Sequence, residues 1–450
     1  MNPLWRKYFS QRAPRYTSYP SAFFFDSSVT PEAYMAKLGE IGLYQPLSLY
    51  FHVPFCRRQC WYCGCNMRIE NNYERALSYV DALREEIRLV ARGLGGRGRP
   101  QTIHFGGGTP NYLSADDLAG VIETVELELG LTDQARLAIE IDPRELKTSD
   151  ARRLVGLGFS RISIGVQDFD PEVQAAINRI QPFELVEAAV ADMRAAGVMD
   201  ISFDLLYGLP KQTLSSFQAS IEKAIALGPD RLSVFGYAHL PQSIKRQRLI
   251  REDDLPGGET RVDLAETADA MLIDGGYARV GFDHYARPGN TLANAAARRQ
   301  LRRNFQGFTD DAAKASIGLG ASAISCVDGL YAQNAKAIDV YKNQVQSGVL
   351  PIERGIERTS RDEAIAHTIE EFLCTTETDI GPVLAGASAR EAEAIRQSLG
   401  ELAEDGVIEW RAGHIRLAEG AGLLARVAAS ALDPLAARNR IEASRFSCAV

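Results

Sequence analysis

The chain has 450 residues, of which 46% are hydrophobic and 24% are charged, and its formal net charge is −8. This composition indicates a globular protein that is long enough for two domains. The acidic balance disfavours binding to extended nucleic acid, which requires a concentrated basic face, and no apolar run approaches the roughly 18 residues of a membrane-spanning helix.

We expect residues 1–40 to form an N-terminal arm, whose basic and aromatic stretch Arg15-Tyr-Thr-Ser-Tyr-Pro20 lies over the mouth of the domain that follows. Met1–Ser10 contains Arg6 and Lys7 without an apolar run behind them, so it does not resemble a signal peptide. A thiol-rich chain without such a signal is expected in a reducing compartment, which favours the cytoplasm.

Four cysteines lie within ten residues, in a loop that follows the first predicted strand, Leu47–Val53. Cys56, Cys60 and Cys63 are separated by three and then by two residues, so each thiolate can reach a different iron of one cubane cluster. Electron-carrying clusters normally use four cysteine ligands, whereas three ligands leave one iron open to a substrate or cofactor. The spacing therefore favours catalysis over simple electron transfer.

Two other interpretations of these cysteines are weaker. A Cys-x-x-Cys pair is often redox-active or half of a zinc site, but a structural zinc site usually needs a second pair or two histidines. Cys326, Cys374 and Cys448 stand alone, and the six histidines show no metal-ligand spacing. A disulfide is disfavoured by the reducing compartment.

Short apolar runs recur about every thirty residues, and the segments between them, such as Tyr73–Leu94 and Ser114–Leu129, have apolar residues at helical spacing. This alternation predicts an α/β fold with parallel strands, a partial (β/α)6 TIM-like barrel. The predicted strands are Leu47–Val53, Thr102–Phe105, Leu137–Ile141, Arg161–Val166, Ile201–Leu206 and Arg231–Tyr237.

Polar or glycine-rich residues follow these strands, at the end where such a barrel carries its active site. The run Gly106-Gly107-Gly108-Thr109-Pro110 follows the second strand and lets backbone groups approach a ligand, although such a run is usually only a tight turn. A lone carboxylate would be read as a cap or a surface charge. Polar groups at the ends of consecutive strands, however, predict a shared site, and they include Glu140, Gln167, Asp168 and Asp204.

Beyond residue 351 the predicted elements differ from those of the barrel. Arg361–Leu373 and Ala389–Glu404 are predicted helices, and Val407–Trp410 with His414–Leu417 can form a small hairpin, an order typical of a winged-helix unit. The acidic run at Glu401–Asp405 disfavours DNA binding. We therefore expect two domains after the arm, a catalytic barrel with its extension over 41–350 and a mainly helical domain over 351–450 that covers the barrel or docks a partner.

With its flanks, the cysteine loop resembles that of the radical S-adenosylmethionine (SAM) superfamily. In that superfamily a CxxxCxxC loop holds a [4Fe-4S] cluster, SAM chelates the fourth iron, and the reduced cluster cleaves SAM to methionine and a 5′-deoxyadenosyl radical. The run Gly106–Pro110 resembles the GGTP motif that holds the methionyl amino group of SAM.

Further motifs resemble one family within it, the oxygen-independent coproporphyrinogen III oxidases, also called coproporphyrinogen dehydrogenases, from about Arg15 to Phe446. They are Arg15–Pro20, the Cys63-Gly-Cys65-Asn66 extension, Gly165–Phe169, Asn178-Arg179, Asp204–Lys211, Tyr237–Pro241, Asp283–Arg287, Arg303–Gly307 and Gly320–Ser325. A haem-handling paralogue typically lacks the equivalent of Cys65. Gly236 departs from the family, in which asparagine is common there.

The resemblance implies the roles of individual residues. Cys56, Cys60 and Cys63 match the cluster ligands, and Cys65 matches a cysteine that is not a ligand. The positions that match the first SAM site are Tyr50, Gly107, Gly108, Thr109, Glu140, Gln167, Arg179 and Asp204. The positions that match a second SAM site are Tyr62, Ala238 and Ile324.

The resemblance also implies the reaction, in which two propionates of coproporphyrinogen III become vinyl groups and give protoporphyrinogen IX for haem and porphyrin biosynthesis. It implies two SAM molecules per product, an unidentified electron donor and acceptor, and no assigned catalytic side chain, since the radical abstracts the hydrogen. We also expect a monomer and, from the net charge, no nucleic acid partner. Basic residues should bind the carboxylates, and the candidates are Arg15, Lys211, Lys245, Arg287 and Arg303.

Two alternative functions are considered for the chain. They are a haem-binding or haem-delivering paralogue and a cluster-bearing DNA-binding regulator.

Overall fold

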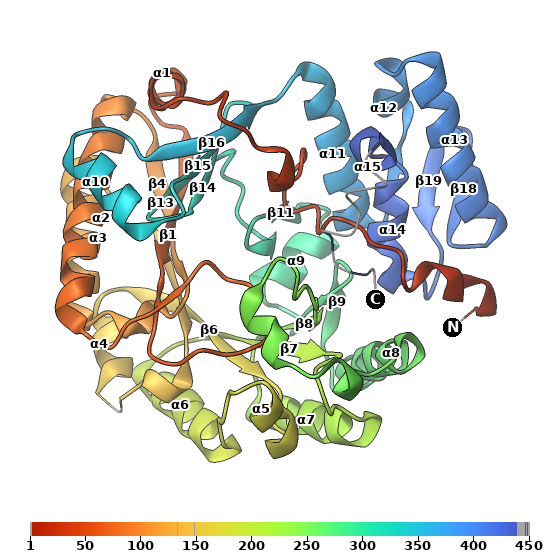
Figure 1. The fold of residues 1–450 in the computed structure, drawn as a ribbon, viewed down its shortest axis with the longest axis horizontal. Coiled ribbons are helices and arrows are strands. Elements are labelled where there is room, and N and C mark those ends of the chain that lie inside the picture. Colours follow the sequence, from red (N-terminus) through yellow and green to blue (C-terminus); the bar gives the residue numbers. More distant parts are fainter. Residues whose placement is uncertain (1, 133, 148, 439–445, 447, 449–450) are drawn as a thin grey trace.

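The computed structural model of the chain describes all residues except 1, 133, 148, 439–445, 447 and 449–450 (Figure 1). Its centre is a twelve-stranded sheet in the order β16-β15-β14-β13-β1-β4-β5-β6-β7-β8-β10-β9. The six strands predicted from the sequence lie side by side and parallel, so the α/β class and the partial barrel are confirmed. They are β1 (Pro46–Val53), β4 (Arg99–Gly107), β5 (Arg136–Ile141), β6 (Phe159–Gln167), β7 (Asp200–Tyr207) and β8 (Arg231–Gly236).

Helices connect these strands and cover the outer side of the curved sheet (Figure 1). The longest, α2 (Tyr73–Leu94), begins where the Asn72 side chain accepts from the amide of Glu74 and ends at Gly95, whose φ of 54° suits glycine. The others are α3 (Ala115–Leu129), α4 (Asp150–Gly156), α5 (Pro171–Ala176), α6 (Phe183–Ala196), α7 (Leu214–Leu227) and α8 (Gly258–Asp274). Apolar side chains on the outer face of the strands pack against them, as at Phe51, Phe105 and Phe203, which are fully buried.

The sheet extends beyond the barrel on both edges, through strands whose ranges were not predicted from the sequence. β13 (Ala315–Leu319) pairs parallel with β1, and antiparallel strands continue from it: β14 (Ile324–Val327), β15 (Leu330–Asn334) and β16 (Ile352–Glu357). On the other edge β10 (His284–Ala286) and β9 (Ala278–Val280) add to β8. Since β16 belongs to this sheet, the sheet continues past the expected domain boundary at residue 351.

Smaller elements complete the central domain. β2 (Phe55–Cys56) pairs with β3 (Arg68–Ile69) around the cysteine loop, and β11 (Arg302–Asn304) forms a hairpin with β12 (Gly307–Thr309). The remaining helices of this part are α9 (Thr291–Ala297) and α10 (Ile338–Gln346).

The C-terminal part has the element order of a winged helix. It runs through α11 (Ser360–Thr375), β17 (Glu377–Asp379), α12 (Gly381–Ala385), α13 (Ala389–Glu404), β18 (Ile408–Arg411) and β19 (His414–Leu417), and is followed by α14 (Ala425–Ser430) and α15 (Pro434–Arg438). The predicted helices and hairpin are present, whereas β17 and α12 were not foreseen. β17 pairs with β19, so it completes a three-stranded sheet.

The N-terminal arm joins this C-terminal part to the far side of the barrel (Figure 1). A 3-10 helix (Pro3–Tyr8) places the indole N–H of Trp5 3.0 Å from the carbonyl oxygen of Asp405. Further along, the hydroxyl of Tyr16 donates to Asp433 at 3.0 Å, and helix α1 (Pro31–Glu40) packs against α2. The arm therefore crosses the molecule from one domain to the other.

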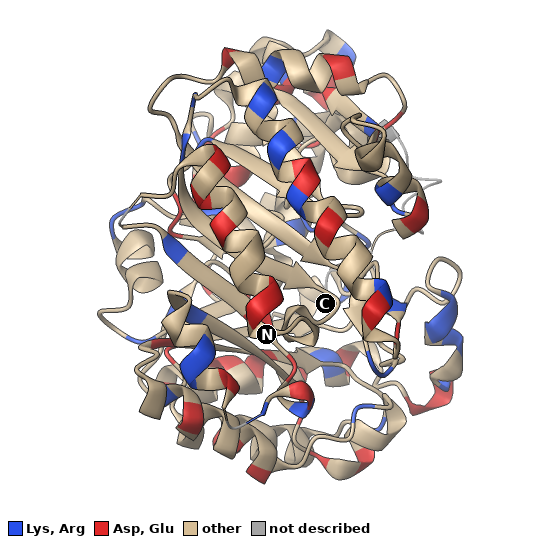
Figure 2. Ribbon diagram, turned by 90° about the vertical axis from the view of Figure 1, so that its left-hand side faces the viewer, with Lys and Arg blue, Asp and Glu red and all other residues tan. Residues whose placement is uncertain are grey.

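Charges of both signs are interspersed on the face drawn in Figure 2, without a concentrated basic area on that face. Among the described residues, the structure contains no helix that is both long and apolar enough to cross a membrane.

Candidate active site

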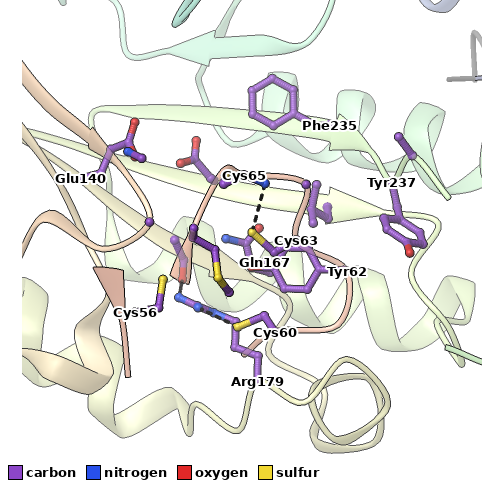
Figure 3. A pocket seen from close by; sticks show the side chains of 18 of the residues that line it. Cys56, Cys60, Tyr62, Cys63, Cys65, Glu140, Gln167, Arg179, Phe235 and Tyr237 are labelled. Carbon is purple, nitrogen blue, oxygen red and sulfur yellow. Dashed lines mark hydrogen bonds between the residues drawn. The ribbon is translucent and has the colours of Figure 1, made fainter. Parts of the chain in front are cut away.

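The carboxyl ends of the barrel strands open into a cavity of about 500 Å³ (Figure 3). A second cavity of about 410 Å³ adjoins it, because Cys65, Gly107 and Glu140 line both. The residues singled out from the sequence that line the first cavity are Cys56, Cys60, Tyr62, Cys63, Gly107, Gly108, Thr109, Glu140, Gln167, Arg179, Asp204 and Ala238. Tyr50 and Ile324 line the second.

The cysteine loop is fixed to the barrel by contacts of its backbone. The amide of Trp61 donates to the carbonyl of Ile177 at 3.0 Å, and the Nδ2 of Asn178 donates to the carbonyl of Gln59 at 2.7 Å. Arg246 donates its Nε to the carbonyl of Cys63 at 2.6 Å. These bonds leave the cysteine side chains free to point into the cavity.

Each sulfur of the CxxxCxxC motif accepts a hydrogen bond. The donors are Thr109 Oγ1 to Cys56 at 3.3 Å, Arg144 Nη2 to Cys60 at 3.4 Å, Arg179 Nη1 to Cys60 at 3.5 Å and the Cys65 amide to Cys63 at 3.4 Å. Figure 3 shows the last of these bonds and Arg179 directed toward Cys60. Such donors stabilise thiolates, the form of cysteine that ligates metals.

The donor set fits a cluster better than a single ion. The seven cysteines are free thiols, and among the described residues no group of three or more His, Cys, Asp or Glu side chains surrounds one point as the ligands of a single ion would. In a cubane each thiolate binds its own iron, so Cys56, Cys60 and Cys63 need only face one cavity, as they do. Three such ligands leave a fourth iron for another group.

The thiols differ in acidity before any metal binds. Burial raises the pKa of Cys56 to about 12. Hydrogen bonds from the side chain and the amide of Cys65 lower the pKa of Cys63 to about 6, with help from the charges of Arg246 and Arg179. The side-chain bond to Cys63 in turn raises the pKa of the Cys65 thiol. Metal binding by Cys56 must therefore release a proton.

The glycine run brings the second strand against the cysteine loop. Gly107 has φ of 119°, a value that other residues rarely adopt, and a Cβ there would lie 2.7 Å from the His52 ring. A Cβ on Gly108 would lie 2.9 Å from the carbonyl oxygen of Phe55 and 3.1 Å from the sulfur of Cys56. The run is therefore more than a turn, because it allows contact between backbone and cysteine loop.

Two carboxylates face the cavity from different strands of the barrel, and their pKa values are shifted in opposite directions. Glu140 on β5 accepts from His104 at 3.2 Å and from the Gly107 amide at 3.1 Å, and although burial opposes its ionisation these contacts lower its pKa. Burial, together with the charge of Glu140, raises the pKa of Asp204 on β7 to about 6. Asp204 therefore changes its charge close to neutral pH.

An ion-pair network beside Cys60 was not foreseen. Asp142 accepts from Arg144 at 2.6 Å and from Arg179 at 3.2 Å, and these contacts hold the pKa of Asp142 well below its usual range even though burial opposes ionisation. Arg179 also donates to the carbonyl of Gly165 at 2.7 Å. The only sequence signal was the position of Asp142 and Arg144 directly after the strand that carries Glu140.

Asp168 does not belong to the cavity, contrary to the prediction from its place at a strand end. The chain turns at Gln167, whose φ is 68°, so that Gln167 lines the cavity while Asp168 is fully buried away from it. Asp168 accepts from Gln212 at 2.6 Å and from Ser220 at 2.8 Å, and burial raises its pKa to about 6. Its role is to hold the β6 turn.

The structure brings only some of the basic candidates to the cavities. Arg15 lines the first and Arg303 the second, whereas Lys211, Lys245 and Arg287 line neither. Arg287 lies at the amino end of β8, where its Nε donates to the carbonyl of Pro229 at 3.1 Å. Basic residues that sequence reasoning missed also line the two cavities: Arg58, Arg144, Arg302, Lys314 and Arg358.

Comparisons with known proteins agree with this geometry. The model of the radical SAM superfamily matches residues 50–224. An oxygen-independent coproporphyrinogen III oxidase from Bradyrhizobium diazoefficiens is 40% identical over 429 residues, which is 95% of each chain. Its counterpart from Escherichia coli is 37% identical, over 89% of this chain and 88% of its own. The solved E. coli coproporphyrinogen III oxidase, described as a radical SAM enzyme, has a TM-score of 0.87 at 35% identity and covers 95% of this chain and 97% of its own.

Proposed function

The chain belongs to the oxygen-independent coproporphyrinogen III oxidase family of the radical SAM superfamily, and on this premise we propose that it converts two propionates of coproporphyrinogen III into vinyl groups, giving protoporphyrinogen IX. Its cofactors are a [4Fe-4S] cluster and SAM. The observation that carries the proposal is the meeting of cysteine loop, glycine run and strand-end carboxylates at one cavity.

We propose that Cys56, Cys60 and Cys63 ligate the cluster. Their support is the shared cavity and the hydrogen bond to each sulfur. Cys65 is proposed to act beside the cluster rather than on it, since its amide already donates to Cys63.

The cavity linings support the proposed SAM sites. The first SAM would contact residues from successive strand ends, namely Tyr50, Gly107, Gly108, Thr109, Glu140, Gln167, Arg179 and Asp204. The second would lie near Tyr62, Ala238 and Ile324. Tyr62 and Ala238 are held together by Gln247, whose Nε2 donates to both carbonyls at 2.8 and 3.0 Å.

The substrate explains why radical chemistry is needed. The β-hydrogen of a propionate side chain is not acidic, so a general base would not remove it. When bound, the cluster and SAM would supply a radical able to abstract this hydrogen atom, and loss of carbon dioxide, with one electron passing to the acceptor, would leave the vinyl group. The chain's own residues orient the reacting groups within the cavity, where a misplacement of about 1 Å can cost about a hundredfold in rate.

We also propose that the enzyme works as a monomer in the cytoplasm with a separate electron donor and acceptor. One chain supplies every proposed site residue, and its cysteines are free thiols. The acidic C-terminal unit and the net charge of −8 give no support to DNA binding.

One anaerobic incubation tests the proposed reaction. The reconstituted chain is mixed with SAM, a reductant and coproporphyrinogen III, and tetrapyrroles are separated by chromatography. We expect protoporphyrinogen IX to form through a mono-vinyl, tripropionate intermediate. Cleavage of SAM without any change in the tetrapyrrole, together with tight binding of haem, would instead favour a haem-handling function.

A further inference from the structure

A third, narrow cavity of about 40 Å³ lies between the end of β8, the N-terminal arm and the C-terminal domain. Arg15 and Phe235 line both it and the first cavity, and Arg303 lines both it and the second. We call it the arginine recess, because Arg15, Arg303 and Arg426 line it. It is a side pocket of the active site that could hold one small group of a larger ligand.

The three arginines come from three separate parts of the chain. Arg15 lies on the arm, Arg303 on β11 and Arg426 on α14. Among the described residues that line the recess, Asp283 is the only acidic one; it hydrogen-bonds to His284 Nδ1 at 2.6 Å, and its charge also acts on Arg303 and Arg426. Positive charge thus exceeds negative charge in this part of the recess, an arrangement that favours an anion.

Two hydrogen-bond donors of Arg303 have no partner among the described residues. Its Nη2 donates to the carbonyl of Arg15 at 3.0 Å, and its guanidinium lies 4.4 Å from the centre of the Phe308 ring and 4.9 Å from that of Phe282. Its Nε and Nη1 are shielded from solvent and have no hydrogen-bond partner. A buried donor without a partner is costly, and a carboxylate is the acceptor that matches an arginine fork best.

Arg426 contributes charge from a fixed position. It donates to the carbonyl of Ala13 at 3.2 Å and to that of Cys448 at 2.7 Å, so it also ties the arm to the C-terminal segment. Burial, followed by the positive charge of Arg15, lowers the pKa of Arg426 to about 10. A bound anion would relieve this repulsion.

We infer that the arginine recess binds a propionate carboxylate of the tetrapyrrole, with Arg303 as the hydrogen-bonding anchor and Arg15 and Arg426 as its charge partners. The inference rests on the proposed function for the identity of the ligand. It gives the arm and the C-terminal domain a direct part in substrate binding, since each supplies one arginine.

The test compares two probes, coproporphyrin III with its four free propionates and coproporphyrin III tetramethyl ester, in which each carboxylate is replaced by a neutral methyl ester. Binding of each to the reconstituted holoenzyme is measured by fluorescence titration. We expect Arg303→Gln and Arg426→Gln to weaken binding of the acid by about 10- to 100-fold and to leave binding of the ester unchanged. The KM for coproporphyrinogen III should rise by a similar factor, with a smaller effect on kcat.

Arg287→Gln is the matched control, because Arg287 is an exposed arginine at the opposite end of β8. This variant should bind both probes as the wild type does. Arg303→Lys keeps the charge but not the fork and should fall between wild type and Arg303→Gln. Iron content and circular dichroism report whether each variant is folded. If Arg303→Gln does not fold, Arg303→Lys and Arg426→Gln decide the question.

Unchanged acid binding in the folded variants, or an equal loss for acid and ester, would overturn the inference. Its failure is separate from failure of the proposed reaction. If the wild type forms protoporphyrinogen IX but the arginine variants bind the acid normally, the proposed reaction stands and this subsite does not exist. If binding depends on the arginines but the wild type forms no product, the subsite exists and the proposed reaction is wrong.

Discussion

A thiol gives up its proton when it ligates iron, and the thiols of the cysteine loop begin from different states. Cys63 is acidified by its neighbour, whereas burial raises the pKa of Cys56 to about 12. The hydrogen bond from Thr109 compensates in part for the burial of Cys56. Cluster assembly should therefore depend on the three cysteines together.

Changing Cys56, Cys60 or Cys63 to Ala should abolish the cluster, because each removes the ligand of a different iron. Iron and sulfide content of the reconstituted proteins is the measurement. Cys326→Ala and Cys374→Ala are the controls and should keep full iron, since neither lies in the loop. Loss of iron in the controls with full retention in Cys60→Ala would contradict the ligand assignment.

The pKa of Asp204 gives the cavity a pH dependence. Its ordinary value is 3.8, and burial with the charge of Glu140 raises it to about 6, so the carboxylate is charged only above that pH. If the charged form binds SAM, SAM affinity should rise as pH increases between about 5 and 8. Asp204→Asn should bind SAM about tenfold more weakly at the upper pH, lose this dependence and keep its cluster.

Equilibrium binding of SAM to the reconstituted variants provides the measurement, with Asp263→Asn, an exposed change on α8, as the control. A pH dependence that persists unchanged in Asp204→Asn would show that another group titrates. Normal deoxyadenosine yield from both Asp204→Asn and Glu140→Gln would show that these carboxylates are structural.

Site residues that are close together in the sequence could be predicted from their spacing. The cysteine motif could be read this way, and so could the glycine run. Arg426 could not be predicted, because it meets Arg15 only when the C-terminal domain folds against the arm. Asp168 was assigned to the wrong side of its strand end because the sequence does not disclose the positive φ of Gln167.

At the scale of elements, α2 is joined to the edge of the barrel by a buried glutamate. Glu86 accepts from the Gly320 amide at 2.7 Å, from Asn334 Nδ2 at 2.6 Å and from the Tyr341 hydroxyl at 2.7 Å. Burial raises its pKa from 4.5 to about 7. The folded state therefore retains a proton over a pH range in which the unfolded chain has lost it.

This raised pKa predicts a loss of stability as pH increases. Between pH 4.5 and about 7 the folded protein binds more protons than the unfolded chain, so the free energy of unfolding falls across this window and then stays level. The loss amounts to about 3 kcal/mol at most. Glu86→Gln cannot titrate, so its stability should be flatter over the window.

Urea unfolding under anaerobic conditions at several pH values measures this effect. Glu123→Gln, an exposed change on α3, is the matched control and should keep the slope of the wild type. An unchanged slope in Glu86→Gln would show that a different group is responsible.

The elements with strong periodicity were predicted closely, and the short ones were not. α2 and α13 match their predicted ranges because long amphipathic helices carry many repeats of one pattern. β13 and β17 are only 5 and 3 residues long and follow no helical repeat, so they become recognisable only by pairing with β1 and β19. The strands of the barrel could be predicted from the sequence, whereas the strands of its extension are recognisable only in the folded structure.

At the scale of the molecule, the arm and the C-terminal domain close one side of the active site. The indole of Trp5 contacts Asp405 and the hydroxyl of Tyr16 contacts Asp433, so residues about 400 positions apart are joined. Asp405 belongs to the acidic run that disfavours DNA binding, and Trp5 reaches it through the backbone carbonyl, whereas Tyr16 reaches the side chain of Asp433 outside that run. The C-terminal domain thus lies against the arm, and α14, which follows the winged-helix elements, carries Arg426.

The stoichiometry of the whole reaction follows from the substrate. Two propionates must each lose a hydrogen atom, and one deoxyadenosyl radical abstracts only one. If SAM is consumed rather than regenerated, two deoxyadenosines should form per protoporphyrinogen IX. Quantifying both products in one anaerobic time course checks this ratio, and a ratio of one would refute the argument.

The second SAM position can be probed without touching the cluster ligands. Ala238 lines the first cavity, and Gln247 joins its carbonyl to that of Tyr62. Ala238→Trp would fill the space beside Tyr62, so the second decarboxylation should slow, with the mono-vinyl intermediate accumulating, or turnover should stop. Ala385→Trp, exposed on α12, controls for added bulk. Unchanged rate and product ratio in Ala238→Trp would mean that this space holds no reacting cofactor, and both radicals would then have to arise from a single SAM site filled twice.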